Sequence, residues 1–199
     1  METDTIDLLE VLATDVDQAF ESLVFIYQDQ LYTFVLRQVR SPQDAEDIVQ
    51  ETFLQVYHAL KRYPPERIRA LALRPWMYKI ARYIWYNRLR HNKLQQISLE
   101  TMEDTMFLEQ EEEQPDILVE ELEARHELEA LVKQLPLHYS EAITLYYFEH
   151  FTYQEIAYLL NQSIGTVKAH LHRGIQRLRQ ACITREHETR SIDGTNAAP

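Results

Sequence analysis

The chain has 199 residues, of which 45% are hydrophobic, and a formal net charge of −12. Three glycines and few runs of alternating polar and apolar residues favour an all-α protein of one or two small domains. Cys182 is the single cysteine, which excludes an internal disulfide and a cysteine-cluster metal site. No apolar run reaches membrane-spanning length, and the acidic N-terminus is unlike a signal peptide. We therefore expect a cytoplasmic protein with no membrane insertion of its own, no metal and no cofactor.

The charge is distributed unevenly along the chain. Residues 1–36 hold eight Asp and Glu and no Lys or Arg, whereas residues 37–93 hold twelve Lys and Arg and five acids. Residues 94–131 hold thirteen acids and one Arg. Local fields decide where a polyanion binds, so the acidic total does not exclude a nucleic-acid partner.

The first 60 residues predict three helices. Apolar side chains recur at helical spacing in residues 7–40, which indicates a short helix followed by a longer one. Ser41-Pro42 predicts the start of the next helix, with a capping hydroxyl and a proline at the first position. Opposite its apolar face, that helix carries acids, amides and one leucine: Asp47, Gln50, Glu51, Leu54 and Gln55. This second face is either a protein-docking surface or a solvated face with an exposed leucine.

A loop is expected from Tyr63 to Pro75, followed by the helix WMYKIARYIWYNRLRHNK. Cations and aromatic rings form one stripe on this helix, at Lys79, Arg82, Tyr83, Tyr86 and Arg90. Cations follow a phosphate backbone and rings stack on unpaired bases, so this mixture suits single-stranded or opened DNA. The alternative is that the rings belong to the core and the arginines surround them. We favour the DNA interpretation because the helix has a separate apolar stripe that includes Met77 and Ile84.

The next segment, residues 94–124, predicts a flexible acidic linker because like charges repel and little can be buried. Helical spacing resumes with Leu128 and Leu131, and Ser140 is predicted to cap the helix EAITLYYFEH. Residues 183–199 predict a disordered tail.

Residues 152–180 predict a helix, a tight turn and a second helix. Thr152 and Glu155 have the spacing of a capping box, so a helix should start at Tyr153. Ser163 is expected to cap the second helix. Its apolar stripe is Ile164, Val167, Leu171 and Leu178. Its other side presents Thr166, Lys168, His170, Arg173, Arg177 and Arg179. A major-groove recognition helix requires this combination, although an ordinary helical hairpin with a basic face has the same spacing.

Three segments, in this order, resemble the extracytoplasmic-function (ECF) sigma factors, the smallest class of the sigma-70 family of bacterial RNA polymerase. DAEDIVQETFLQVY resembles the polymerase-docking helix, PWMYKIAR resembles the promoter-opening helix, and residues 135–179 resemble the C-terminal domain. The resemblance implies two helical domains joined by a flexible acidic linker. Residues 1–93 would dock on core polymerase and melt the −10 element. Residues 94–124 would be the linker, residues 125–182 a helix-turn-helix domain for the −35 element, and residues 183–199 the tail.

The resemblance also implies partners and site residues, and no covalent chemistry. It implies docking of Asp47, Gln50, Glu51, Leu54 and Gln55 on the clamp helices of the largest polymerase subunit, with further contacts to the flap. It implies that residues 61–74 help to read the −10 element, together with a set on and before the stripe: Arg74, Trp76, Lys79, Arg82, Tyr83, Tyr86 and Arg90. It implies −35 contacts by Ser163, Thr166, Lys168, His170, Arg173 and Arg177. An anti-sigma factor is the further partner that it implies.

Two other functions remain open from the residues alone. A stand-alone helix-turn-helix regulator would explain residues 125–181 but not the acidic face or the cationic stripe. A metal-dependent enzyme could use Asp44, Asp47 and Glu51, but no second carboxylate cluster faces them in the pattern. Where relatives often have Ser-Arg, this chain has Ala169-His170. If His170 faces DNA, −35 binding is expected to strengthen at mildly acid pH.

Overall fold

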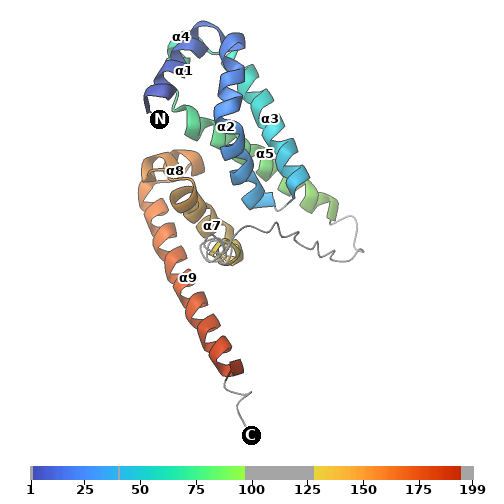
Figure 1. Ribbon diagram of the computed structural model, residues 1–199, viewed down its shortest axis with the longest axis vertical. Coiled ribbons are helices and arrows are strands. Elements are labelled where there is room, and N and C mark those ends of the chain that lie inside the picture. The colour runs from blue at the N-terminus through green and yellow to red at the C-terminus, as the bar shows by residue number, and fades with distance from the viewer. Residues whose placement is uncertain (1, 40, 97–127, 194–199) are drawn as a thin grey trace, which may run out of the picture. The chain divides into compact units, whose positions relative to one another are not determined.

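The computed structural model describes residues 2–39, 41–96 and 128–193, which are helical apart from short connections (Figure 1). The chain divides into two units, Met1–Met106 and Phe107–Pro199, called here the N-terminal and C-terminal units. No strand occurs in the described ranges, which confirms the predicted all-α fold. The predicted acidic linker lies outside the described residues from residue 97 onwards. No helix in these ranges combines the length and apolarity needed to cross a membrane.

The N-terminal unit is built on three long helices. Its described helices are α1 Glu2–Thr14, α2 Val16–Val39, α3 Pro42–Leu60, α4 Pro65–Arg69 and α5 Leu73–Gln96 (Figure 1). Helices α2, α3 and α5 pack against one another, and α1 packs against α2 and the short α4. The core is formed by apolar side chains at helical spacing, among them Leu12, Leu23, Leu31, Ile48, Val56, Leu60, Met77, Tyr78 and Ala81.

Local hydrogen bonds explain where two of these helices begin. The Ser41 hydroxyl accepts a hydrogen bond from the Asp44 amide at 3.3 Å, which confirms the predicted start of α3 at Pro42. Before α2, Oδ1 of Asp15 accepts from the amides of Asp17 and Gln18 at 3.0 and 3.2 Å. The sequence pattern did not single out Asp15, although aspartate is a preferred capping residue.

The prediction of a continuous loop as far as Pro75 is wrong. Helix α4 occupies Pro65–Arg69, and α5 begins at Leu73, before Pro75. Proline is accepted in a first helical turn because the amides there have no intrahelical partner in any case. The two prolines therefore mark helix starts, and the segment between α3 and α5 has a defined shape.

The C-terminal unit is smaller. Helix α7 Leu137–Ile143 continues into a π-helical turn, Thr144–Phe148, and is followed by α8 Tyr153–Leu160 and α9 Ile164–Asp193. Residues 128–134 are helical as well. Helices α7 and α8 both pack on α9. Side chains from each segment form its core: Leu131, Val132, Ile143, Leu145, Phe151, Ile156, Leu159, Leu160, Val167, Leu171 and Leu178.

Three details of this unit differ from the predictions. Ser140 was expected to cap a helix, but α7 begins at Leu137 after Pro136, and Ser140 lies inside it and is buried. Ile164 was expected in the buried stripe, but it is 40% exposed because it is the first residue of α9 and lies at the end of the packed face. Residues 183–193, predicted to be disordered, continue α9 as far as Asp193. No Gly or Pro interrupts that stretch, and adding residues to an existing helix costs little.

Helices α7 and α9 cross at Gly174. A Cβ added there would lie 2.6 Å from Cδ1 of Ile143 and 3.3 Å from Cβ of Tyr139. The absence of a side chain at Gly174 allows this close approach, which fixes the position of α9 against α7.

Candidate protein and nucleic-acid interfaces

The predicted docking face of α3 is exposed. Asp47, Gln50 and Gln55 are exposed, Glu51 has 44% of its side chain accessible, and Leu54 is 61% exposed. The structure thus brings all five predicted residues to one face. An apolar side chain among carboxylates and amides is the composition expected of a surface that a protein partner covers.

Arg88, which the sequence pattern did not single out, lies against this face from α5. Its guanidinium pairs with Glu51 at 3.3 Å and with Asp47 at 3.7 Å. Within the described ranges, no group of three or more His, Cys, Asp or Glu is placed to hold a metal ion. The arginine also supplies the positive charge that a metal would supply to these carboxylates, which argues against a metal face on α3.

The cationic and aromatic stripe on α5 is largely confirmed as a surface. Tyr83 is 62% exposed, Arg90 is exposed, and Lys79, Arg82 and Tyr86 are half-buried. The guanidinium of Arg82 lies 4.4 Å from the centre of the Tyr86 ring. A ring with a cation over one face and an exposed tyrosine nearby can hold unpaired bases by stacking.

Two residues predicted to contact DNA lie at the start of α5: Trp76 belongs to the packed interior, whereas Arg74 is half-buried. Trp76 is 8% exposed and its ring lies 5.9 Å from that of Tyr63, so it is a core side chain. Arg74 donates a hydrogen bond from Nε to Oε1 of Gln30 at 3.2 Å and lies over the buried Tyr78 ring. The DNA contact that the resemblance implied for Trp76 is therefore wrong, because packing at the start of α5 turns this ring inwards.

Two cations of residues 61–74, Lys61 and Arg69, pair with carboxylates of the first two helices. Lys61 donates to Asp17 of α2 at 2.8 Å, and Nε of Arg69 lies 2.9 Å from Oε2 of Glu10 of α1. Hydrogen bonds from Lys61 and then Tyr57 hold the pKa of Asp17 below its ordinary value. The Arg67 guanidinium lies 3.6 Å from the centre of the Tyr63 ring. This segment is therefore a shaped cationic surface.

The helix-turn-helix has the predicted local structure. The Thr152 hydroxyl accepts from the Glu155 amide at 3.3 Å, and the Glu155 carboxylate accepts from the Thr152 amide at 2.8 Å, which confirms the capping box. Asn161 ends α8 in the left-handed conformation, with φ 53°. The Ser163 hydroxyl accepts from the Thr166 amide at 3.1 Å, so Ser163 caps α9 as predicted.

The predicted −35 residues do not all share one face of α9. Lys168 lies on the side of α8, 5.6 Å from the Tyr153 ring centre, and Arg177 lies on the side of α7, 5.4 Å from the Tyr139 ring centre. Between them, the outward face presents Thr166 and Arg173, together with two exposed residues that the prediction left out, His172 and Gln176. Helical spacing would have found both, because Gln176 lies three residues after Arg173 and His172 lies four residues before Gln176.

His170 is turned towards α7, against the prediction that it faces DNA. Its ring centre lies 4.9 Å from that of His138 and 5.6 Å from that of Tyr139, and Nδ1 is buried without a hydrogen-bond partner in the described part of the chain. Burial, and then the neighbouring His138 and Arg173, lower the pKa of His170. A neutral, inward-turned imidazole gives no reason for DNA binding to strengthen at mildly acid pH.

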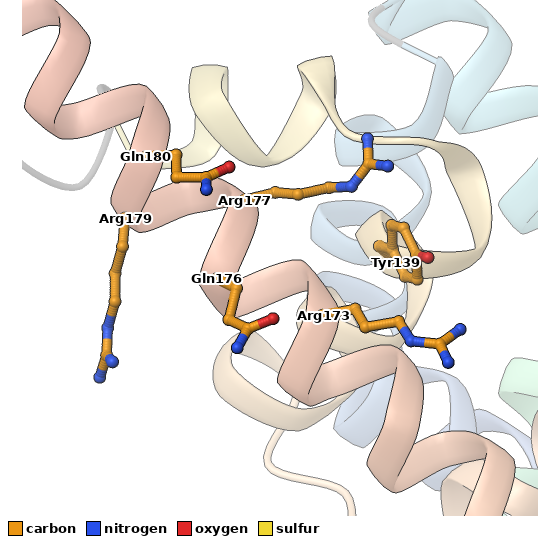
Figure 2. A pocket seen from close by; sticks show the side chains of 6 residues that line it. All are labelled: Tyr139, Arg173, Gln176, Arg177, Arg179 and Gln180. Atoms are coloured by element: carbon orange, nitrogen blue, oxygen red, sulfur yellow. The ribbon is translucent and has the colours of Figure 1, made fainter.

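A groove of about 470 Å³ runs along α9 beside Tyr139. Figure 2 shows Arg173 and Arg177 extending on either side of Tyr139, whereas Arg179 points away. Two amides complete the lining, Gln176 and Gln180. The lining has no carboxylate, so it is suited to phosphate oxygens and base edges.

Comparison with known proteins agrees with this arrangement. Residues 23–95 match the family described as Sigma-70 region 2, and residues 125–178 match Sigma-70, region 4. The ECF RNA polymerase sigma factor SigW of Bacillus subtilis is 30% identical over 168 residues, which cover 81% of this chain and 88% of SigW. The ECF sigma factor SigE of Mycolicibacterium smegmatis is 27% identical over 172 residues, or 86% of this chain, and the match spans 64% of the length of SigE.

A solved structure shares the fold. The sigma factor RpoE of Bartonella quintana, in complex with the anti-sigma factor NepR, superposes with a TM-score of 0.62 at 20% identity. The match covers 81% of this chain and 94% of that one. The chain therefore belongs to the ECF sigma factors, a class of the sigma-70 family. It is an alternative sigma factor that directs promoter-specific transcription, as the resemblance in the sequence implied.

Proposed function

We propose that three described surfaces each bind a different target during promoter recognition. The α3 face docks on core RNA polymerase, the α5 stripe and residues 61–74 hold the opened −10 element, and α9 reads the −35 duplex. One observation carries this proposal: the surfaces differ in chemistry, with acids and a leucine on α3, cations with rings on α5, and cations with amides on α9. The proposed units are residues 1–93 and 125–182, joined by an acidic linker.

Docking through α3 follows from its composition. Asp47 and Glu51 attract a cationic surface, and Leu54, 61% exposed, offers apolar area to bury. The partner surface that fits is basic with an apolar recess, and we assign it to the clamp helices of the largest polymerase subunit. A second contact of the C-terminal unit with the polymerase flap belongs to the same proposal.

Opening of the −10 element follows from the α5 stripe. Stacking a base on an aromatic side chain contributes about 1–3 kcal/mol, which is comparable with the cost of unstacking it from the duplex. Tyr83 is accessible for this, and Lys79 and Arg82 lie beside it for the phosphates. Trapping unpaired bases requires no covalent step, so the proposed role is binding and not catalysis.

Reading of the −35 element follows from the groove and the outward face of α9. Arg173 can contact guanine through two N–H groups, and Gln176 can contact adenine in the same way. Lys168 and Arg177 lie on opposite sides of the helix, where they can reach phosphates on the two strands that border a major groove.

An anti-sigma factor is proposed as a further partner, acting in the bacterial cytoplasm. Support comes from the fold that the chain shares with RpoE, which was solved with the anti-sigma factor NepR. A protein that covers the docking face of α3 or the groove of α9 would prevent the contacts proposed above.

Gel filtration of the chain with bacterial core RNA polymerase at moderate salt tests the proposal. We expect co-elution, and we expect it to be lost when Asp47 and Glu51 are both replaced by Lys. Replacement of the exposed Glu21 and Asp29 of α2 by Lys makes the same charge change outside α3 and should leave co-elution intact. A folded chain that fails to co-elute but binds specific duplex DNA by itself would instead indicate a stand-alone regulator.

A further inference from the structure

Arg88 connects the docking face of α3 to α5. Its Nη2 donates a hydrogen bond to Oε2 of Glu51 at 3.3 Å, and its Nη1 lies 3.7 Å from Oδ2 of Asp47. The other carboxylate oxygen of Glu51, Oε1, accepts a hydrogen bond from Nε2 of Gln55 at 3.4 Å. The guanidinium of Arg88 therefore contacts two of the five side chains that are proposed to dock, and a third, Gln55, is hydrogen-bonded to one of these two.

These contacts determine how the two carboxylates are presented. Asp47 and Glu51 are four residues apart on one helix, so they repel each other unless a cation lies between them. Arg88 is the least exposed of the three, with 35% of its side chain accessible against 55% for Asp47 and 44% for Glu51. A guanidinium offers N–H groups in a fixed planar fork and can bind both carboxylates at once, which a lysine ammonium does less well.

We propose that Arg88 is a positioning residue for polymerase binding: it holds Asp47 and Glu51 in the arrangement that the polymerase binds. The inference rests on the proposed docking role of α3. An exposed ion pair contributes little to folding, so its effect is expected in binding, where side chains that are already ordered need not be immobilised by the partner. Arg88 also connects the docking face of α3 to α5. Tyr83, in the stripe proposed to bind the −10 element, lies on a different side of α5 from Arg88.

The test measures the affinity of the full chain for bacterial core RNA polymerase by fluorescence anisotropy. The dye is attached to Cys182, the single cysteine, which is exposed. Salt is kept at about 0.3 M, where the Debye length is about 6 Å, so that a change in net charge alone has little effect. We expect Arg88→Met to bind about three- to tenfold more weakly, the range for losing the order of one or two side chains. Arg88→Lys should fall in between.

The matched control is Lys133→Met, which removes the same charge from an exposed lysine of the C-terminal unit and should bind like the unmodified chain. The effect of Arg88→Met is also measured in a chain that carries Glu51→Ala, to distinguish a role in positioning Glu51 from a general effect on folding. There the loss caused by Arg88→Met should shrink to within about twofold, because the hydrogen bond to Glu51 is already absent and only the longer pairing with Asp47, at 3.7 Å, remains to be lost. Circular dichroism verifies that each variant is folded.

Unchanged affinity of Arg88→Met, or an equal loss with and without Glu51, would overturn the positioning role while leaving the docking role in place. If the unmodified chain does not bind core polymerase at all, the proposed function is overturned, and the positioning role with it.

Discussion

The two units treat their cations differently. In the N-terminal unit, three cations pair with carboxylates of neighbouring helices: Lys61 with Asp17 at 2.8 Å, Arg69 with Glu10 at 2.9 Å and Arg88 with Glu51 at 3.3 Å. Other cations of this unit, Arg67 and Arg82, lie over the rings of Tyr63 and Tyr86. In the C-terminal unit, cations lie over aromatic rings: Lys168 over Tyr153 at 5.6 Å and Arg177 over Tyr139 at 5.4 Å.

This difference matches the proposed targets. Where a carboxylate pairs with a cation, it cancels the charge and fixes the position of the side chain, which shapes the α3 face and the surface of residues 61–74. A ring orients a cation but leaves its N–H donors available for phosphate oxygens. The C-terminal unit should therefore depend more on the phosphates of a duplex, and its binding should respond more to salt.

The largest expected effect distinguishes core from surface on α3. Ile48 is 1% exposed and Leu54 is 61% exposed, although they lie on the same helix. Ile48→Ala should lower the free energy of unfolding of the N-terminal unit by about 2–5 kcal/mol, because it leaves a cavity. Leu54→Ala should change it by less than about 0.5 kcal/mol and should weaken polymerase binding instead. Urea unfolding followed by circular dichroism measures both, and similar losses for the two variants would contradict the packing described.

The next effect concerns the C-terminal unit alone. Gly174→Ala places a methyl group 2.6 Å from Cδ1 of Ile143, whereas at Gly165 the nearest atom would be 3.7 Å away. Both substitutions gain helix propensity, so Gly165→Ala is the matched control. The difference between them should be about 1–3 kcal/mol in the free energy of unfolding, the typical cost of overpacking. Co-elution with polymerase through the N-terminal unit should persist in both, and its loss in Gly174→Ala would show that the units are not independent.

The third prediction tests the contrast between cations directly. Lys168→Met and Arg177→Met should each reduce the salt slope of binding to a short duplex by about 0.9, one phosphate contact each. The duplex carries the −35 element alone, so Arg69→Met is the comparison: Arg69 pairs with Glu10 and belongs to the segment proposed for the −10 element. Its slope should remain that of the unmodified chain. Fluorescence anisotropy at a series of salt concentrations gives the slopes. A larger change in slope for Arg69→Met than for Lys168→Met would contradict the claim that cations over rings, and not carboxylate-paired cations, contact the phosphates.

The smallest expected effect is a pH dependence from His170. Its pKa is lowered in the folded state, so the unfolded chain binds more protons as pH falls below about 6.5. The stabilisation is therefore present above that pH and is lost progressively as pH falls towards the lowered pKa. His170→Gln should flatten this decline, as measured by thermal unfolding between pH 7.5 and pH 5, values chosen to bracket the ordinary histidine pKa of about 6.5. A steeper decline in the variant would contradict the inward position of His170.

Local chemistry made parts of the structure predictable from the sequence. The capping box of Thr152 and Glu155 and the Ser41-Pro42 start depend on hydrogen bonds between residues three apart, so the sequence contains all the information. The acidic face of α3 was likewise predictable from helical spacing. Where two local signals competed, one of them prevailed: Pro136 occupies the N-cap position of α7, four residues before Ser140, so the helix begins at Leu137.

The rest depends on contacts between helices. Helical spacing gives the centre of a stripe but not its edges, so His170, at the edge of the basic side of α9, was assigned to DNA although its ring turns towards α7. The resemblance implied a DNA contact for Trp76, which packs inwards instead. Arg88 could not be identified from the sequence, because its carboxylate partners lie 37 and 41 residues away on another helix. Gln176 and His172 were missed although Gln176 lies three residues after Arg173, and His172 lies four residues before Gln176, on the exposed side of α9.

The most direct test of the division of work is transcription from a library of randomised promoters. Core polymerase with this chain should select promoters that share two elements at a constant separation. Arg173→Ala should then relax base preference in the −35 element only, and Tyr83→Ala should change selection in the −10 element only. Two results would contradict the assignment of the N-terminal unit to the −10 element and the C-terminal unit to the −35 element. One is a set of selected promoters with no shared elements, and the other is a change in the same element by both variants.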